Sequence, residues 1–155
     1  MKWFTLSYLI KDNQICLGLK KRGFGVGKWN GFGGKVEKSE SVVEAAIREL
    51  NEESLVTVDS KDLRQVLDVE FFFKDGKHLR VPTFFVHQWK GDPTETEEMK
   101  PAWFDFDKIP YDKMWSDDIY WMPRVFKGET LRGKVWFEED VFFIEKMEWE
   151  EVDRF

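Results

Sequence analysis

Three closely spaced glutamates could bind a divalent metal ion. Glu49, Glu52 and Glu53 lie three and four residues apart in the sequence, so a helix would place them side by side. Neighbouring carboxylates repel one another, and Mg²⁺ relieves that repulsion because it prefers oxygen ligands and often joins carboxylates to phosphates. A solvated acidic helix face explains the three glutamates equally well. A magnesium site therefore needs support from the residues around them.

The segments that must position these glutamates are a glycine-rich stretch and a helix. Residues 21–34 are rich in glycine, which lets a backbone turn sharply or approach a ligand closely, so we expect a loop there. Ser41 and Glu44 then form a capping-box pattern. The apolar residues that follow recur at helical spacing and are Val43, Ala46, Ile47 and Leu50. We expect a helix over 42–53.

The spacing of these residues resembles the Nudix box. Gly34 is followed by five residues, then Glu40, then seven residues, then the run RELNEE. The sequence departs from the box at Leu55, where the family usually has glycine. That position shapes the end of the helix and not the metal ligands. The resemblance implies a Mg²⁺-dependent hydrolase of a nucleoside diphosphate linked to another group, with Mn²⁺ as a substitute ion.

The resemblance also assigns residues to the metal site. The family's metal-binding positions fall on Glu49, Glu52, Glu53 and the backbone near Gly34. Arg48 and Glu40 match supporting positions, and Arg48 can hold a glutamate through a fork-shaped ion pair. We expect Arg48 and the three glutamates to be catalytic, without naming which glutamate is the base. Glu98 is a further candidate ligand or base, and an exposed acidic loop is its alternative interpretation.

Two other stretches, KKRGFGVGKWNGFGGK and DKMWSDDIYW, resemble the MutT-homologue subgroup that removes oxidised purine nucleotides. The similarity covers most of the chain and implies hydrolysis of 8-oxo-dGTP or 2-hydroxy-dATP to the monophosphate and pyrophosphate. Positions that contact the purine fall on Asn30, Trp115, Asp117 and Asp118. Positions at the pocket wall fall on Thr5, Phe24, Phe72, Leu79 and Trp121, with Leu79 where the subgroup has methionine.

The adjacent Asp117 and Asp118 could read the edge of a base. If both are half-buried and close together, they do not both ionise easily, so one keeps a proton. A protonated carboxyl donates a hydrogen bond and an ionised one accepts, which matches a purine edge. The two residues alone fit the first turn of a helix better, because aspartate is favoured there. Asn30 and the flanking tryptophans favour the pocket.

Composition narrows the class of protein. With 155 residues, 42% of them hydrophobic, we expect one domain over 1–155. A net charge of −6 argues against stable binding to nucleic acid. One cysteine and two histidines exclude an internal disulfide and a histidine-rich metal site. The apolar N-terminal stretch is too short to span a membrane and lacks a cleavage signal, so we expect a cytoplasmic protein. The resemblance implies a small-molecule nucleotide substrate, and we expect a monomer.

Strand and helix patterns alternate along the chain. The expected strands are 3–10, 14–20, 64–74, 79–88 and 102–106. Asp75-Gly76 is expected at the turn between the third and fourth of them, partial helix from Tyr111, and a last hairpin turning over Glu138 to Asp140. This mixed order predicts an α/β domain with a mixed β-sheet between helices, and the resemblance makes it a Nudix fold.

Other functions stay open at this point. A methylated purine triphosphate, a dinucleoside polyphosphate or a capped RNA end would need the same glutamates and a different pocket. A nucleotide-binding module without catalysis would not need the glutamates, so their presence argues against it. A calcium-binding EF-hand is excluded, because no stretch alternates Asp and Asn ligands around a central glycine.

Overall fold

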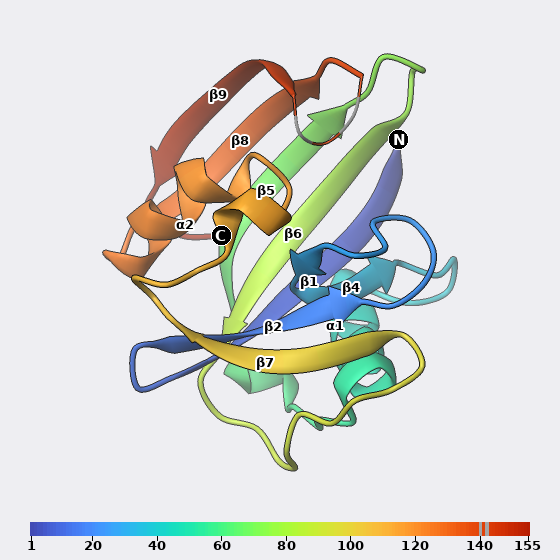
Figure 1. The fold of residues 1–155 in the computed structure, drawn as a ribbon, viewed down its shortest axis with the longest axis vertical. Helices are drawn as coiled ribbons and strands as arrows, with labels where there is room; N and C mark the ends of the chain where they lie inside the picture. The colour runs from blue at the N-terminus through green and yellow to red at the C-terminus, as the bar shows by residue number, and fades with distance from the viewer. Residues whose placement is uncertain (140, 142) are drawn as a thin grey trace.

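The computed structural model describes residues 1–139, 141 and 143–155 (Figure 1). Its strands are β1 (Lys2–Lys11), β2 (Gln14–Lys20), β3 (Trp29–Asn30), β4 (Phe32–Lys35), β5 (Leu63–Phe72), β6 (His78–Val86), β7 (Met99–Asp105), β8 (Thr130–Phe137) and β9 (Ile144–Val152). Its helices are α1 (Val42–Ser54) and α2 (Asp118–Phe126), with short 3₁₀ turns at Ser60–Asp62 and Tyr111–Lys113. No helix in the described ranges has the length and apolar character to cross a bilayer.

The expected secondary structure needs two changes. The glycine-rich segment is not all loop, because the short strands β3 and β4 lie inside it. The partial helix expected from Tyr111 is one 3₁₀ turn, and α2 starts only at Asp118 and contains Pro123. In the last hairpin, β8 and β9 flank the expected turn, whose Asp140 lies outside the described residues.

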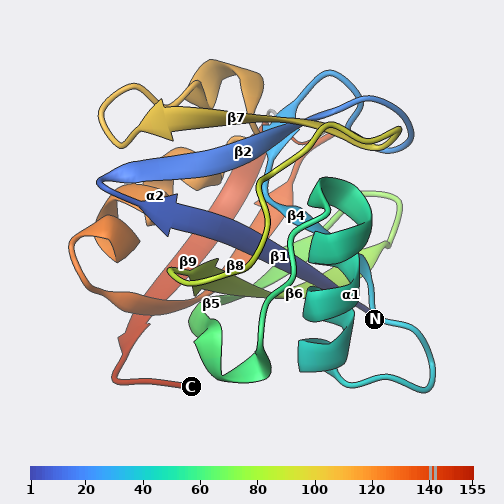
Figure 2. The same ribbon diagram turned by 90° about the horizontal axis from the view of Figure 1, so that it is seen from below.

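The strands form one mixed sheet, as the sequence predicts. Hydrogen-bonded neighbours follow the order β3-β2-β1-β6-β5-β8-β9, while β4 pairs with β1 and β7 with β2. The pairs β1–β6 and β5–β8 are parallel and the others are antiparallel. Helix α1 packs against β4, β1 and β7, whereas α2 packs against β8 (Figure 2). The α/β architecture with a mixed sheet between helices is confirmed.

Local signals fix both ends of α1. The Ser41 hydroxyl accepts a hydrogen bond from the Glu44 amide at 3.1 Å, and the Glu44 carboxylate accepts one from the Ser41 amide at 2.9 Å. The helix ends at Leu55, which has φ 64° and donates its amide to the Asn51 carbonyl at 2.8 Å. This left-handed conformation favours glycine, so Leu55 ends the helix at a cost of about 1 kcal/mol.

Strand β5 alternates between two different surroundings. Phe71 is buried in the main hydrophobic core, on the side of the sheet that α2 covers. Phe72 faces the other side, where its ring stacks on His78 at 4.3 Å and on Trp136 at 5.0 Å between ring centroids. Asp68 lies on that side too, paired with Arg80 at 2.6 Å. Because successive side chains of a strand point to opposite faces, β5 presents an apolar face to the core and a mixed charged and aromatic face on the other side.

Candidate active site

Two glycines of β4 bring the glutamate helix close to β1. Thr5 pairs with Gly34 and Leu6 with Gly33 in the antiparallel β1–β4 ladder. A Cβ atom at Gly33 would lie 1.7 Å from the Thr5 carbonyl oxygen, and one at Gly34 would lie 2.6 Å from Glu49 Oε1. Only glycine permits these approaches. The strand thus places a bare backbone beside the first glutamate of the cluster.

Glu53 is the most enclosed of the three glutamates. Its side chain is buried and accepts a hydrogen bond from the Gly33 amide at 2.7 Å. The Lys20 ammonium lies 3.9 Å from its other oxygen. Burial raises the pKa of Glu53 to about 7, although the Gly33 amide and Lys20 act to lower it. A carboxyl group with this pKa can exchange a proton near neutral pH.

Arg48 holds the other two glutamates. Its Nη1 donates to Glu49 at 2.9 Å and to Glu52 at 3.3 Å, and its Nη2 donates to the Lys35 carbonyl at 3.1 Å. Glu40 pairs with the same guanidinium from the far side. Burial raises the pKa of Glu49, and its bonds to Arg48 oppose that rise. Arg48 therefore offsets part of the negative charge of this cluster.

The oxygen ligands of this cluster fit a divalent metal ion whose remaining ligands come from a bound substrate. Across the part of the chain that the structure describes, no three His, Cys, Asp or Glu side chains form a ready-made metal cage. Mg²⁺ does not need one, because it binds through one or two carboxylates, waters and phosphate oxygens. Glu49 and Glu53 supply carboxylate oxygens beside the backbone of Gly33 and Gly34. These are the hard ligands that such an ion prefers.

Glu98 lies near this cluster but is engaged elsewhere. Its carboxylate accepts a hydrogen bond from Arg22 Nε at 2.9 Å, and this bond lowers its pKa. Its negative charge still contributes to the raised pKa of Glu53, which puts it within electrostatic reach. Glu98 would therefore have to leave Arg22 to bind a metal ion.

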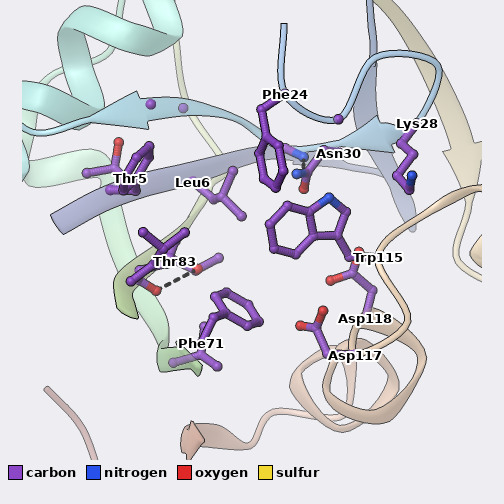
Figure 3. A pocket seen from close by; sticks show the side chains of 18 of the residues that line it. Thr5, Leu6, Phe24, Lys28, Asn30, Phe71, Thr83, Trp115, Asp117 and Asp118 are labelled. Carbon is purple, nitrogen blue, oxygen red and sulfur yellow. Dashed lines mark hydrogen bonds between the residues drawn. The ribbon is translucent and has the colours of Figure 1, made fainter. Parts of the chain in front are cut away.

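A cavity of about 300 Å³ extends from Glu53 to the start of α2. Figure 3 shows Asp117 and Asp118 on its wall. Its lining includes Gly33, Gly34 and Glu53 together with Asp117 and Asp118. Most of the wall between them is apolar or aromatic and comes from β1, β5 and β6. A volume of this size lies at the lower end for small-molecule sites. Glu53 and the two aspartates therefore face one shared space.

The aspartate pair is buried at the start of α2. Asp117 and Asp118 are 1% and 4% exposed, and the Trp121 indole donates to one oxygen of each at 3.1 Å. Their remaining oxygens, Asp117 Oδ1 and Asp118 Oδ2, are buried without a hydrogen-bond partner among the described residues. Burial raises the pKa of Asp117 to about 7, and burial together with the Asp117 charge raises that of Asp118. The pair therefore keeps a proton at neutral pH.

Asn30 lines the same cavity with a fixed amide. Its Oδ1 accepts hydrogen bonds from the Gly31 amide at 2.8 Å and from the Tyr8 hydroxyl at 3.2 Å. The Nδ2 group is what remains of this side chain to offer a ligand. The cavity thus combines one amide donor with two carboxyl groups that share a proton, a set that can match donors and acceptors on a base edge.

Aromatic rings form the wall beside the aspartates. Trp115 meets Phe24 edge-on at 5.6 Å and Phe71 at 5.4 Å between ring centroids. Phe24 is 63% exposed and also lies under the Lys77 ammonium at 5.3 Å, at the rim of the cavity. These rings offer flat surfaces on which a base can stack.

The structure brings eight of the nine expected substrate residues to the cavity. They are Thr5, Phe24, Asn30, Leu79, Trp115, Asp117, Asp118 and Trp121. The placement of Phe72 was wrong, because the alternation of β5 turns it to the outer face and puts Phe71 in the wall. Sequence reasoning also missed Leu6 and Thr83, which line the cavity. A strict period of two along β5 identifies Phe71, whereas apolar strands give no signal for which residues line a cavity.

The fold and this site define a Nudix hydrolase. The Nudix domain family matches residues 5–125, and the chain belongs to that family. The chain is 42% identical over 149 residues to the oxidized purine nucleoside triphosphate hydrolase of Danio rerio, covering 95% of this chain and 94% of that protein. It is 42% identical over 137 residues to the Mus musculus protein of the same name, covering 88% and 86%.

Solved structures share the fold. A MutT protein from Bacillus halodurans superposes with a TM-score of 0.80 at 23% identity, covering 97% of this chain and 98% of that one. A MutT Nudix hydrolase from Burkholderia pseudomallei has a TM-score of 0.64 at 26% identity, covering 70% and 86%. Members of the Nudix family generally need a divalent metal ion, which agrees with the hard ligands beside β4. The expected domain extent of 1–155 stays a prediction.

Proposed function

We propose that this enzyme hydrolyses oxidised purine nucleoside triphosphates to the monophosphate and pyrophosphate. The observation that carries the proposal is the buried Asp117–Asp118 pair, which lines the same cavity as Glu53. The two vertebrate relatives support it, because both are named for this activity and match most of the chain. The enzyme would thereby remove damaged nucleotides from the precursor pool.

The aspartate pair and Asn30 would bind the base. A carboxyl group that keeps its proton donates a hydrogen bond, while its ionised neighbour accepts one. Because the pair shares a proton, moving it between Asp117 and Asp118 would let one pocket bind both an 8-oxo-guanine and a 2-hydroxy-adenine. Trp115 would stack on the base from one wall, with the Phe24 ring edge-on to Trp115 at the rim of the cavity.

The glutamate cluster would bind the phosphates through Mg²⁺, with Mn²⁺ able to substitute. We assign Glu49, Glu52, Glu53 and the backbone near Gly34 as ligands, with Glu98 as a further candidate. When bound, such an ion neutralises phosphate charge and lowers the pKa of a coordinated water. Arg48 orients Glu49 and Glu52 through its guanidinium. Lys20, which lines the cavity beside Glu53, can hold a phosphate oxygen.

We also propose a monomer in the cytoplasm. Cys16 is a buried free thiol. This supports a location in a reducing compartment, because cysteines there stay free and disulfides are rare. Cell fractionation tests the compartment, and size-exclusion chromatography with light scattering tests the oligomeric state.

A turnover screen tests the proposed activity. Pyrophosphate release is measured with Mg²⁺ from 8-oxo-dGTP, 2-hydroxy-dATP, dGTP and a methylated purine triphosphate, for the wild type and Glu53→Ala. Glu145→Ala is the matched control, because Glu145 pairs with Lys74 on the surface, away from the cavity. A preference for oxidised purines that Glu53→Ala abolishes supports the proposal. Turnover of another nucleotide alone would reject the assigned substrate, and no turnover would favour a binding module.

A further inference from the structure

Tyr8 lies beneath the cavity, among neither the expected site residues nor the described residues that line the cavity. It is 0% exposed on β1. Its hydroxyl donates to Asn30 Oδ1 at 3.2 Å, and its ring meets the Trp121 ring edge-on at 6.0 Å between centroids. Tyr8 therefore contacts Asn30, whose amide lines the base pocket, and Trp121, whose indole donates hydrogen bonds to both aspartates.

The contacts of Asn30 fix which end of its amide is which. The Gly31 backbone amide can only donate, so the atom it meets at 2.8 Å must be the carbonyl oxygen Oδ1. The Tyr8 hydroxyl adds a second donor to that oxygen. Burial and the charges of Asp118 and Asp117 raise the pKa of Tyr8, so the phenol keeps its proton. Turning the amide over would set its NH₂ group against the Gly31 amide, which can only donate, and would end the hydrogen bond that the Tyr8 hydroxyl donates to Oδ1.

The packing around Tyr8 is specific to this arrangement. A Cβ atom at residue 31 would lie 2.7 Å from Tyr8 Cζ, so only glycine lets the ring sit directly under this backbone. The ring also meets Phe85 at 6.0 Å between centroids. Tyr8 is thus held from several sides, and its hydroxyl can point at Asn30 without losing side-chain freedom on ligand binding.

We propose that Tyr8 is a positioning residue for the base pocket, whose hydroxyl holds Asn30 with Nδ2 as the donor. The pocket then requires an acceptor at this point of the substrate, either a carbonyl oxygen or an unprotonated ring nitrogen. A base with an amino group there would meet a donor and lose a hydrogen bond. This inference rests on the proposed function, because it concerns the binding of a purine in that cavity.

Kinetics of Tyr8→Phe test the proposal, because this variant keeps the ring and removes only the hydroxyl. We expect kcat/KM to fall about three- to tenfold, mainly through KM, for the purine triphosphate that the wild type hydrolyses best. In an Asn30→Ala background the same change should have no effect, because the hydroxyl acts through Asn30. Tyr120→Phe is the control, since Tyr120 is 49% exposed on α2. Thermal melts verify that each variant folds.

An NMR measurement tests the positioning without turnover. The side-chain NH₂ resonances of Asn30, assigned by their loss in Asn30→Asp, should shift in Tyr8→Phe and stay unchanged in Tyr120→Phe. Unchanged resonances, or an equal fall of kcat/KM in the Asn30→Ala background, would overturn the proposal while the activity stands. A wild type that ignores oxidised purines would instead reject the proposed function, and the NMR result would still decide the role of Tyr8.

Discussion

The two ends of the cavity control negative charge in different ways. At the glutamate end, Arg48 and Lys20 lie beside the carboxylates, and the Gly33 amide donates to Glu53. At the aspartate end, one oxygen of each aspartate meets the Trp121 indole, and the other is buried without a hydrogen-bond partner within the described ranges. Cations offset part of the negative charge at one end, and a retained proton lowers it at the other.

This difference assigns the two ends to different parts of a nucleotide. Cations and hard oxygen ligands suit phosphates, which stay charged at all working pH values. A shared proton suits a base edge, whose donors and acceptors change with its oxidation. Experiments that alter one end should therefore leave the task of the other intact.

Removing divalent ions should give the largest effect. We expect chelation to lower pyrophosphate release by more than about a thousandfold and Mg²⁺ or Mn²⁺ to restore it, because charge neutralisation at phosphorus is lost. Affinity for the nucleoside monophosphate, measured by calorimetry, should change less than about threefold, because base contacts dominate it. A parallel loss of monophosphate binding would contradict the separation of the two ends.

Alanine at Asp117 or Asp118 should give the next largest effect. Each change removes a buried hydrogen-bonding group, so kcat/KM for an oxidised purine triphosphate should fall about 10- to 100-fold, mainly through KM. Steady-state kinetics measure this, with Asp107→Ala as the control because Asp107 is exposed. Unchanged KM and kcat in both variants would remove the aspartates from base binding.

The aspartate pair should also make stability depend on pH. The pKa of Asp117 is about 7 in the folded protein and 3.8 is its ordinary value, so folding favours the protonated form. This contribution is fully present below about pH 4 and is lost as the pH rises through about 7. Between about pH 5 and pH 8, the unfolding free energy of the wild type should fall by about 1–3 kcal/mol more than that of Asp117→Asn, which removes the titrating group. Urea titrations at both pH values measure it, and parallel curves would contradict the raised pKa.

Leucine at Phe71 and at Phe72 compares the two faces of β5. Phe71→Leu should lower kcat/KM about two- to tenfold, because the ring contacts Trp115 in the wall of the cavity. Phe72→Leu should change it less than about twofold, since its ring stacks on the outer face. If the two variants changed kcat/KM equally, Phe71 would not belong to the wall of the cavity that contacts the substrate.

The smallest effect concerns the end of the glutamate helix. Leu55→Gly should raise the unfolding free energy by about 0.5–1 kcal/mol, because Leu55 has φ 64° and glycine adopts that conformation without steric cost. Leu55→Ala keeps a Cβ atom and should show no such gain. Chemical denaturation compares the three proteins, and a glycine variant less stable than the alanine variant would refute the account.

The sequence predicted the helix that carries the glutamates because its signals are local. Ser41, Glu44 and the apolar spacing determine α1, and Gly34 reaches Glu49 within one continuous segment. The aspartate end is assembled from β1, β3, β5, β6 and α2, so its geometry depends on contacts distant in the chain. The resemblance identified its polar residues. Because residues 71 and 72 are both phenylalanine, the sequence did not show which of them faces the cavity. An apolar strand likewise gives no signal that Tyr8 is the hydrogen-bond partner of Asn30.

The alternation of β5 has a consequence for how relatives diverge. Phe71 pairs with Leu79 on one side and Val135 on the other, whereas Asp68, Glu70 and Phe72 occupy the opposite parity. Deleting one residue from this strand would exchange the two sets and turn an apolar wall into an acidic one. Every Nudix-box residue would remain, and the percentage identity would hardly change. A change of chain length in β5 would therefore remake the cavity wall without touching any residue of the Nudix box.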